Sequence, residues 1–333
     1  MSHSNRIFKA NTVNLDHCAE LLRTGEVVGM PTETVYGLAG NALNQASVRK
    51  IFDVKGRPLI DPLIVHFSAL KAAEVHIDSN DSVRQLANAF WPGPLTIVVP
   101  KKKSIPDIVT AGLPNVAIRV PNHPVFRDIL KRLNFPLAAP SANPFGYVSP
   151  TLASHVARTL GSQIPAILDG GPCDFGLEST IIDLRDPLAP VILRHGPITA
   201  AQITEQLQIR VTSQIDTTDG NAAQNAPGLL TKHYSPKARV TLLEHGEIQL
   251  TDTTLDSTIA LVYNQKPTWH TGQPNIFWLS EASDLSEIAH NLFELIQRLD
   301  QQGYQQIWIE QASEAGLGQA INDRLRRAAA KLD

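Results

Sequence analysis

Short apolar runs alternate with amphipathic segments along the first two hundred residues. Apolar runs bounded by Gly or Pro predict buried strands, and segments with apolar residues three or four positions apart predict helices. The predicted strands are Val27–Met30, Leu63–Phe67, Leu95–Val99, Val116–Val120, Leu137–Ala139, Ala166–Asp169, Ser179–Leu184 and Val191–Arg194. The predicted helices are Asp16–Thr24, Gln45–Lys55, Ser82–Trp91, Pro124–Leu133, Leu152–Leu160 and Thr199–Leu207. This alternation predicts an α/β fold.

A polar segment separates this region from a second one. The segment Thr212–Ala226 has almost no apolar residues, as is typical of an exposed linker. The next stretch, Ala226–Pro236, carries two leucines, His233 and Tyr234, which indicates an ordered segment. Beyond it, the predicted strands are Val240–Leu243, Thr258–Val262, Ile276–Leu279 and Ile307–Glu310, and the predicted helices are Leu285–Leu299 and Ala320–Leu332. The tail is therefore predicted to be a small α/β domain.

Length and charge narrow the functional class. At 333 residues the chain exceeds the usual size of one domain, so two domains are expected. The net charge of -3 excludes a strong overall attraction to nucleic acid or to a membrane surface. The two cysteines, Cys18 and Cys173, have no metal-ligand spacing and indicate a reducing compartment. With no signal-like N-terminus and no long apolar run, we expect a cytoplasmic protein that does not contact membranes.

Several familiar catalytic motifs are absent from the sequence. There is no Gly-Lys dipeptide and hence no Walker A loop, and there is no HExxH or GxSxG motif. No GxGxxG follows a predicted strand, although Gly316-Leu317-Gly318 opens a predicted helix as a weak, isolated pattern. A bound nucleotide would need to be held by some other arrangement.

Polar residues gather at the ends of the predicted strands. Thr32, Glu33 and Thr34 follow the first strand, and this cluster is either a capped turn or part of a ligand site. The other members are Lys55, Arg57, His66, Arg119, Ser141, Asn143, Ser179, Thr180 and Arg194. Four cations with several hydroxyls suit a ligand that has phosphates and a carboxylate. An anionic small molecule is therefore expected.

Each of these residues also has an ordinary structural interpretation. A single loop Lys or Arg is more often a solvated charge or a surface ion pair. Arg119 differs because it lies within an apolar strand, where a ligand or a buried carboxylate should pair with it. His66 at a strand end is more often a structural histidine than a functional one. The run Lys101–Lys103 is either a solvated turn or an RNA contact.

Six motifs identify a family resemblance. PTETVYGL, KGRP, AIRVP, PSAN, LESTI and HYSP occur here in this order. Together they resemble the threonylcarbamoyl-adenylate synthases in their two-domain form. The resemblance implies a YrdC-like domain with a twisted mixed sheet and a concave cleft over residues 14–207. It further implies a small Rossmann-like α/β domain over 238–333. Residues 208–237 lie between the two domains, and we interpret them as a linker and active-site lid.

The same resemblance implies a reaction and its partners. L-threonine, bicarbonate or CO2, and ATP would give threonylcarbamoyl-AMP and pyrophosphate, the first step of threonylcarbamoyladenosine formation beside the tRNA anticodon. A separate tRNA threonylcarbamoyl transferase complex would take up the product, and direct contact with tRNA stays open. Mg2+ would arrive with ATP, with no metal ligand from the protein expected.

Residue roles follow by matching motif positions. The positions implied to hold threonine or its carbamoyl product are Thr34, His66, Arg119, Ala139 and Ser179, with Arg119 clamping the carboxylate. The positions implied to hold ATP are Lys55, Arg57, Asp61, Asn115, Ser141, Asn143, Ser149, Arg194 and Tyr234, with Lys55 and Arg57 as the catalytic cations. Asp61 and Asn115 depart from the commonest family residues, Asn and Thr. A carboxylate at Asp61 would repel phosphates unless a cation lies between them.

Two alternatives and one structural hypothesis accompany this interpretation. An RNA-binding module without catalysis would use the basic cleft and Lys101–Lys103, and a carbamoyl-adenylate-forming enzyme would start from carbamoyl phosphate. No acylphosphatase-like or zinc-finger segment of the kind that accompanies the latter is present. We further hypothesise that Ala226–Pro236 folds back over the first domain as a lid that protects labile intermediates from water.

Overall fold

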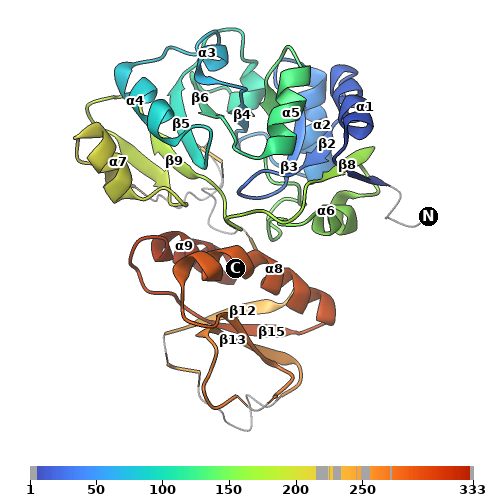
Figure 1. The fold of residues 1–333 in the computed structure, drawn as a ribbon, viewed down its shortest axis with the longest axis vertical. Helices are drawn as coiled ribbons and strands as arrows, with labels where there is room; N and C mark the ends of the chain where they lie inside the picture. Colours follow the sequence, from blue (N-terminus) through green and yellow to red (C-terminus); the bar gives the residue numbers. More distant parts are fainter. Residues whose placement is uncertain are drawn as a thin grey trace.

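The chain folds into two α/β units in the computed structural model, which describes residues 6–214, 224, 226–227, 234–244, 246–248, 256–270 and 272–330. Within these residues the first unit contains an eleven-stranded mixed sheet, and the second contains a four-stranded parallel sheet (Figure 1). The predicted fold class is confirmed. No helix in the described part of the chain is long and apolar enough to span a bilayer.

The elements of the first unit agree closely with the sequence pattern. Its strands are β1 (Ile7–Lys9), β2 (Val28–Met30), β3 (Gly37–Asn41), β4 (Ile64–His66), β5 (Leu95–Pro100), β6 (Asn115–Arg119), β7 (Leu137–Ala138), β8 (Ala166–Asp169), β9 (Thr180–Asp183), β10 (Val191–Arg194) and β11 (Thr212–Ser213). Its helices are α1 (Thr12–Arg23), α2 (Gln45–Lys55), α3 (Leu70–Ala73), α4 (Asp81–Phe90), η2 (Asp107–Thr110), α5 (Pro124–Arg132), α6 (Ala153–Leu160) and α7 (Ala200–Leu207). Helix α1 begins earlier than predicted because the Asn11 side chain caps it by accepting a hydrogen bond from the Asn14 N–H.

The large sheet has apolar clusters on both faces. Its strand order is β1-β8-β2-β3-β7-β4-β6-β5-β9-β10-β11. Successive residues point to opposite faces, so Val28 and Met30 belong to the apolar cluster that includes α1 and α5. Val27 belongs to the cluster that includes α2, α4 and α6. This double burial explains why these strands appear as continuous apolar runs.

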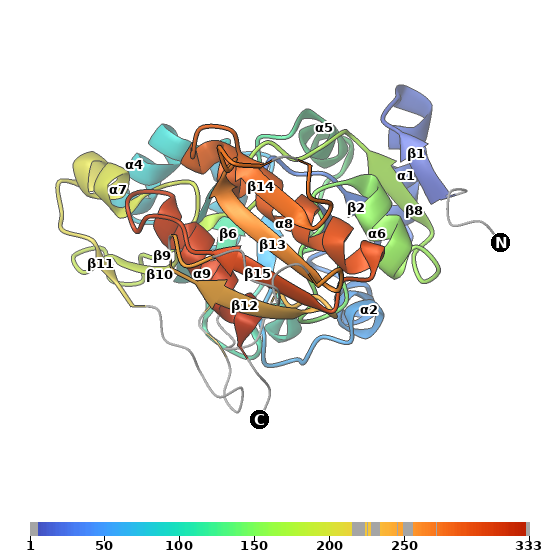
Figure 2. The same cartoon turned by 90° about the horizontal axis from the view of Figure 1, so that it is seen from below.

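The second unit covers one face of its sheet with helices. It contains β12 (Arg239–Leu243), β13 (Ile259–Gln265), β14 (Ile276–Ser280), β15 (Gln306–Glu310), α8 (Leu285–Gln302) and α9 (Gly318–Ala329), with strand order β12-β15-β13-β14. Both helices lie between the small sheet and the first unit in Figure 1, and the view from below in Figure 2 shows the strands in front of them. Val35, Val148 and Leu177 of the first unit join the apolar core of the second, so the two units share buried surface.

The segment between the units is described only in part. Thr212 and Ser213, within the predicted linker, pair with β10 as strand β11. Of the hypothesised lid, Ala226, Pro227 and Tyr234 are described and buried. The central part of that lid, residues 228–233, lies outside the described residues.

Candidate active site

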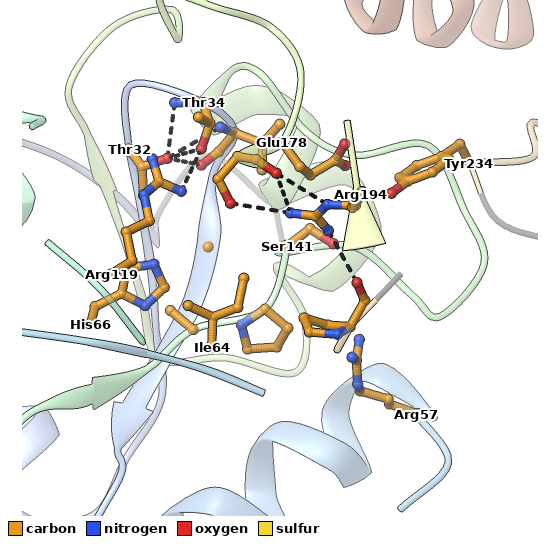
Figure 3. Close-up of a pocket in the computed structure, with 16 residues that line it drawn as sticks. Thr32, Thr34, Arg57, Ile64, His66, Arg119, Ser141, Glu178, Arg194 and Tyr234 are labelled. Atoms are coloured by element: carbon orange, nitrogen blue, oxygen red, sulfur yellow. Dashed lines mark hydrogen bonds between the residues drawn. The ribbon is translucent and has the colours of Figure 1, made fainter. Parts of the chain in front are cut away.

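A small cavity lies in the first unit where several strand ends meet the start of β9 and the end of β10. It is lined by Thr32, Thr34, Val35, Gly37, Arg57, Ile64, His66, Arg119, Ala139, Pro140, Ser141, Glu178, Ser179, Arg194, Pro227 and Tyr234. In Figure 3, Arg119 and His66 lie on one side of this site and Arg57 and Tyr234 on the other, with Ser141 between them. The cavity volume is about 50 Å³, which is room for a few water molecules.

The polar cluster after β2 is both a capped turn and a wall of the cavity. The Thr32 hydroxyl accepts hydrogen bonds from the N–H groups of Thr34 and Val35 and donates to the Val35 carbonyl. It also lies 2.8 Å from the Thr34 hydroxyl. Because Thr32 fixes the turn, the Thr34 side chain has a defined place in the cavity wall. Nearby, Tyr36 donates to the Gly171 carbonyl and so secures a loop behind the turn.

Arg119 has a buried carboxylate partner. Its Nη2 lies 2.8 Å from Oε1 of Glu33, and both side chains are almost inaccessible to solvent. Its Nη1 donates to the Thr34 hydroxyl at 3.0 Å, and its Nε donates to the Gly93 carbonyl at 3.2 Å. The sequence left open whether a ligand or a carboxylate balances Arg119, and the partner present is Glu33. Because a guanidinium has five N–H donors, these three contacts leave capacity for a ligand.

His66 lies beside Arg119 because their strands are parallel neighbours in register. β4 pairs with β6 so that His66 is opposite Arg119. Burial, and then the positive charge of Arg119, lowers the pKa of His66 to about 3. The imidazole is therefore neutral at physiological pH and cannot serve there as a cation. Its ring packs against Phe126 with the ring centroids 5.2 Å apart.

The two cations of the KGRP motif have different surroundings. Lys55 lies outside the cavity wall, and its Nζ donates to the carbonyls of Ser141 and Asn143, both at 2.5 Å. Burial, and then the charge of Arg57, holds the pKa of Lys55 well below its ordinary value. Arg57 lines the cavity and forms an ion pair with Asp61 at 2.8 Å. Arg57 is therefore the cation that balances the negative charge of Asp61, which would otherwise repel phosphates.

Arg194 connects the start of β9 with the segment between the two units. It donates to the Ser179 carbonyl and hydroxyl and, at 3.3 Å, to the Pro227 carbonyl. Tyr234 is buried with a φ of 64°, a left-handed conformation unusual for a residue other than glycine. Its ring stacks on Phe293 of α8 with a centroid distance of 5.4 Å. Residues on both sides of the incompletely described segment thus line the cavity.

The cavity brings together most of the residues predicted for the site. Those that line it are Thr34, Arg57, His66, Arg119, Ala139, Ser141, Ser179, Arg194 and Tyr234. Those that lie outside its wall are Lys55, Asp61, Asn115, Asn143 and Ser149. Asn115 begins β6, at the opposite end of that strand from Arg119. Ser149 donates to Oε1 of Glu178, at 2.5 Å. The roles of all these residues toward threonine and ATP stay predictions.

The sequence pattern assigns no role to three buried charged residues that contact the site or its wall, namely Glu33, Glu178 and Arg324. Glu33 belongs to the polar PTET cluster, where its threonine neighbours give no local signal of a buried partner. Glu178 lines the cavity and directly precedes the predicted Ser179. Arg324 lies on α9, three residues after the buried Ile321 and four before the buried Ala328. Its helical spacing from these residues indicates a core position.

The described residues contain no group of three or more His, Cys, Asp or Glu side chains that could hold a metal ion. The acids at or beside the cavity already have protein partners, as Glu33 has in Arg119. Asp61 pairs with Arg57, and Glu178 accepts hydrogen bonds from Ser149 and Arg324. Among its described residues the site thus offers no cluster of carboxylates to a metal.

Comparisons with known proteins assign the chain to a family. A Sua5/YciO/YrdC family model described as "Telomere recombination" matches residues 20–196, and one described as "Threonylcarbamoyl-AMP synthase, C-terminal domain" matches residues 198–330. The chain is 38% identical to the threonylcarbamoyl-AMP synthase of Pyrococcus abyssi, covering 93% of this chain and 92% of that protein. It is 35% identical to the Bacillus subtilis synthase, covering 96% and 94%.

Solved structures agree with this assignment. The crystal structure of P. abyssi Sua5 complexed with L-threonine matches with a TM-score of 0.87 and 34% identity, covering 97% of each chain. Escherichia coli YciO, at 20% identity and a TM-score of 0.52, covers 60% of this chain and 98% of its own and shows likeness of fold alone. The family resemblance seen in the sequence is confirmed: the chain belongs to the threonylcarbamoyl-AMP synthases, in their two-domain form.

Proposed function

We propose that this protein synthesises threonylcarbamoyl-AMP and pyrophosphate from L-threonine, bicarbonate or CO2, and ATP. The observation that supports this most directly is a cavity lined by three arginines and several hydroxyl groups. Guanidinium groups suit both a carboxylate and phosphates, and this reaction needs a site for each. A relative with 34% identity has been crystallised with L-threonine, which agrees with the proposed amino-acid substrate.

The proposed chemistry needs positioning and charge more than a protein nucleophile. The threonine amine bonds to the carbon of CO2 and loses one proton, which gives a carbamate. A carbamate oxygen then attacks the α-phosphorus of ATP. An oxygen–phosphorus bond forms to the carbamate while the bond to the pyrophosphate oxygen breaks, and pyrophosphate leaves with its negative charge. A displacement at phosphorus is accelerated mainly by aligning the attacking oxygen with the α-phosphorus and by neutralising the negative charge of the departing pyrophosphate.

The threonine end of the cavity is proposed to be the wall formed by Thr34, His66, Arg119, Ala139 and Ser179. There Arg119 would bind the threonine carboxylate with the N–H donors that Glu33 and Thr34 leave available. The neutral His66 would contribute shape and hydrogen bonding without adding charge. This arrangement would give the amino acid a fixed orientation before the carbamate reacts.

The nucleotide end is proposed to involve Arg57, Ser141, Arg194 and Tyr234 directly. Lys55 would act through the Ser141 and Asn143 carbonyls that it holds, and Asp61 through Arg57. We propose that Mg2+ enters with ATP and is held chiefly by the phosphates. No step of the mechanism is assigned to it.

The product is proposed to pass to a tRNA threonylcarbamoyl transferase complex in the cytoplasm. Both cysteines are free and buried, as is common for proteins of a reducing compartment. The lysine run offers little support for direct tRNA contact, because Lys101 pairs with Asp107 and Lys102 donates to the Glu74 carbonyl. We therefore propose no role for Lys101 and Lys102 in binding tRNA.

Release of pyrophosphate from ATP by the purified protein tests the proposed function. We expect release to require both L-threonine and bicarbonate, and chromatography with mass detection should show threonylcarbamoyl-AMP in equal amount. Omitting either substrate, or replacing L-threonine with D-threonine, serves as the control. Pyrophosphate release that ignores threonine, or its complete absence, would refute the proposal.

A further inference from the structure

Arg324 of the second unit is fully buried beneath the cavity of the first. Its Nε donates to Oε2 of Glu178 at 2.9 Å, and its Nη2 donates to the His195 carbonyl at 2.9 Å. Its Nη1 donates to Asp323 at 2.6 Å, within its own helix. One side chain from α9 therefore contacts two separate segments of the first unit.

The two segments that Arg324 contacts lead directly into the cavity wall. Glu178 lines the cavity and precedes Ser179, while His195 follows Arg194. β9 and β10 are antiparallel neighbours, so the start of one and the end of the other lie side by side. Arg194 in turn donates to Ser179 across this pair. A guanidinium that fixes Glu178 and His195 thus fixes the backbone of both adjoining cavity residues.

The same guanidinium packs against the ring of Tyr234, another residue that lines the cavity. The Arg324 Cζ lies 5.5 Å from the ring centroid of Tyr234, within cation–π range. Phe293 of α8 stacks on that ring as well. Side chains from both helices of the second unit therefore pack on the Tyr234 ring.

We propose that Arg324 is a positioning residue for the synthase reaction, through which the second domain sets the places of Glu178, Ser179, Arg194 and Tyr234 in the cavity. This inference rests on the proposed function. It assigns the small domain a defined task, because the cavity wall depends on a side chain that the first domain lacks. Neither substrate is proposed to touch Arg324 itself.

A matched pair of arginine substitutions on α9 tests the proposal. Arg324→Met removes the contacts with Glu178 and His195, whereas Arg326→Met removes only an exposed ion pair with Glu314. We expect Arg324→Met to lower kcat/KM, calculated per folded molecule, by roughly 10- to 100-fold. KM for threonine or for ATP should rise as part of this loss. Arg326→Met should leave both KM values unchanged. Lost stability alone would reduce the folded fraction and leave KM at the wild-type value, which would overturn the proposal.

Arg324→Lys covers the case in which the methionine variant does not fold. A lysine keeps a positive charge near Glu178 but cannot donate to Glu178 and His195 with the fork of a guanidinium. We expect a folded protein whose KM is raised by at least about threefold. A folded lysine variant with wild-type kinetics would contradict a positioning role.

A double-mutant cycle with Glu178→Gln tests whether Arg324 acts through Glu178. If it does, Arg324→Lys and Glu178→Gln together should lower kcat/KM little more than the larger single change. Losses that multiply would refute this route. Titration calorimetry with L-threonine and, separately, with ATP makes the comparison without turnover. Weaker binding of either substrate by Arg324→Lys than by Arg326→Met supports positioning, and equal binding of both opposes it. Failure of the wild type to form product would instead count against the proposed function.

Discussion

Arg119 and Arg324 are both buried opposite a buried glutamate, yet they depend on different parts of the chain. Arg119 lies on β6, and its contacts with Gly93, Thr34 and Glu33 all belong to the first domain. Arg324 lies on α9 of the second domain, and its contacts with Glu178 and His195 belong to the first. One side of the cavity is thus built within a single domain, whereas the other side requires two.

This difference separates two kinds of buried ion pair. The Arg119 pair lies at the cavity surface, where spare N–H donors can serve a ligand. The Arg324 pair lies behind the cavity, where its donors are directed at Glu178, Asp323 and His195. Substitution of Arg119 should therefore weaken the binding of one substrate selectively. Substitution of Arg324 should displace several residues of the cavity wall together.

Arg119→Ala should have the largest effect on both threonine binding and stability. We expect KM for threonine to rise about 100-fold, because a charged hydrogen bond to its carboxylate is lost. KM for ATP should stay near the wild-type value. Stability should fall by about 3–5 kcal/mol, since Glu33 is left buried without its cation. Steady-state kinetics with each substrate varied, together with denaturant unfolding, measure these effects.

The double variant Arg119→Ala with Glu33→Gln sharpens this result. Removing the buried charge of Glu33 should restore most of the lost stability while threonine KM stays high. Arg132→Ala, which removes an exposed ion pair with Asp16, serves as the control and should change neither quantity. Equal rises in KM for both substrates would count against the carboxylate clamp.

Asp61→Asn should alter the nucleotide side of the cavity. Without ATP, loss of the buried partner of Arg57 should lower stability by about 3 kcal/mol. ATP phosphates can replace the missing negative charge, so the rise in Tm on adding ATP should be larger for the variant than for the wild type. Asp107→Asn, at an exposed ion pair, should leave that ATP shift unchanged. An identical shift in Asp61→Asn and wild type would show that Asp61 does not balance Arg57 in the empty site.

Much of the fold could be predicted because its signals are local. The bounds of α2, Gln45–Lys55, agree fully, since Asn44 caps its start and Gly56 its end. The strand Gly37–Asn41 was not predicted, because two glycines and an alanine carry no strand signal of their own. It exists through antiparallel pairing with β2 and β7, which lie on either side of it. Such pairing is a property of the folded sheet and leaves no local pattern.

The site was predictable to the extent that its residues occur in short motifs. Arg119 stood out as a charge within an apolar strand, but nothing local showed that Glu33 would be its partner. Lys55 was expected at the nucleotide, and only the folded chain shows its Nζ between two carbonyls. Arg324 lies 146 residues from Glu178, so no spacing rule connects them. The sequence pattern therefore does not predict contacts between the two domains.

The pH dependence of stability should show that His66 is neutral in the folded protein. Because burial and Arg119 lower its pKa to about 3, the neutral ring contributes stability that is fully present above the unfolded value near 6.5. This contribution is lost as pH falls from 6.5 toward 3. His66→Asn cannot titrate, so the stability difference between wild type and variant should shrink by about 2 kcal/mol between pH 7.5 and pH 5. A difference that does not change with pH would contradict the lowered pKa.

Tyr147→Phe should have the smallest effect and separates docking of the two domains from positioning of the cavity. Tyr147 donates a hydrogen bond to Asp300 across the same interface at 2.6 Å, but it does not line the cavity. Loss of this hydrogen bond should lower the free energy of unfolding by about 1 kcal/mol, the usual contribution of one hydrogen bond. KM for both substrates should stay unchanged. Unfolding and kinetics measured beside Arg324→Lys make the comparison direct. If Tyr147→Phe raised KM as much as Arg324→Lys does, any loosening of the interface would suffice, and the contact between Arg324 and Glu178 would have no special part in shaping the cavity.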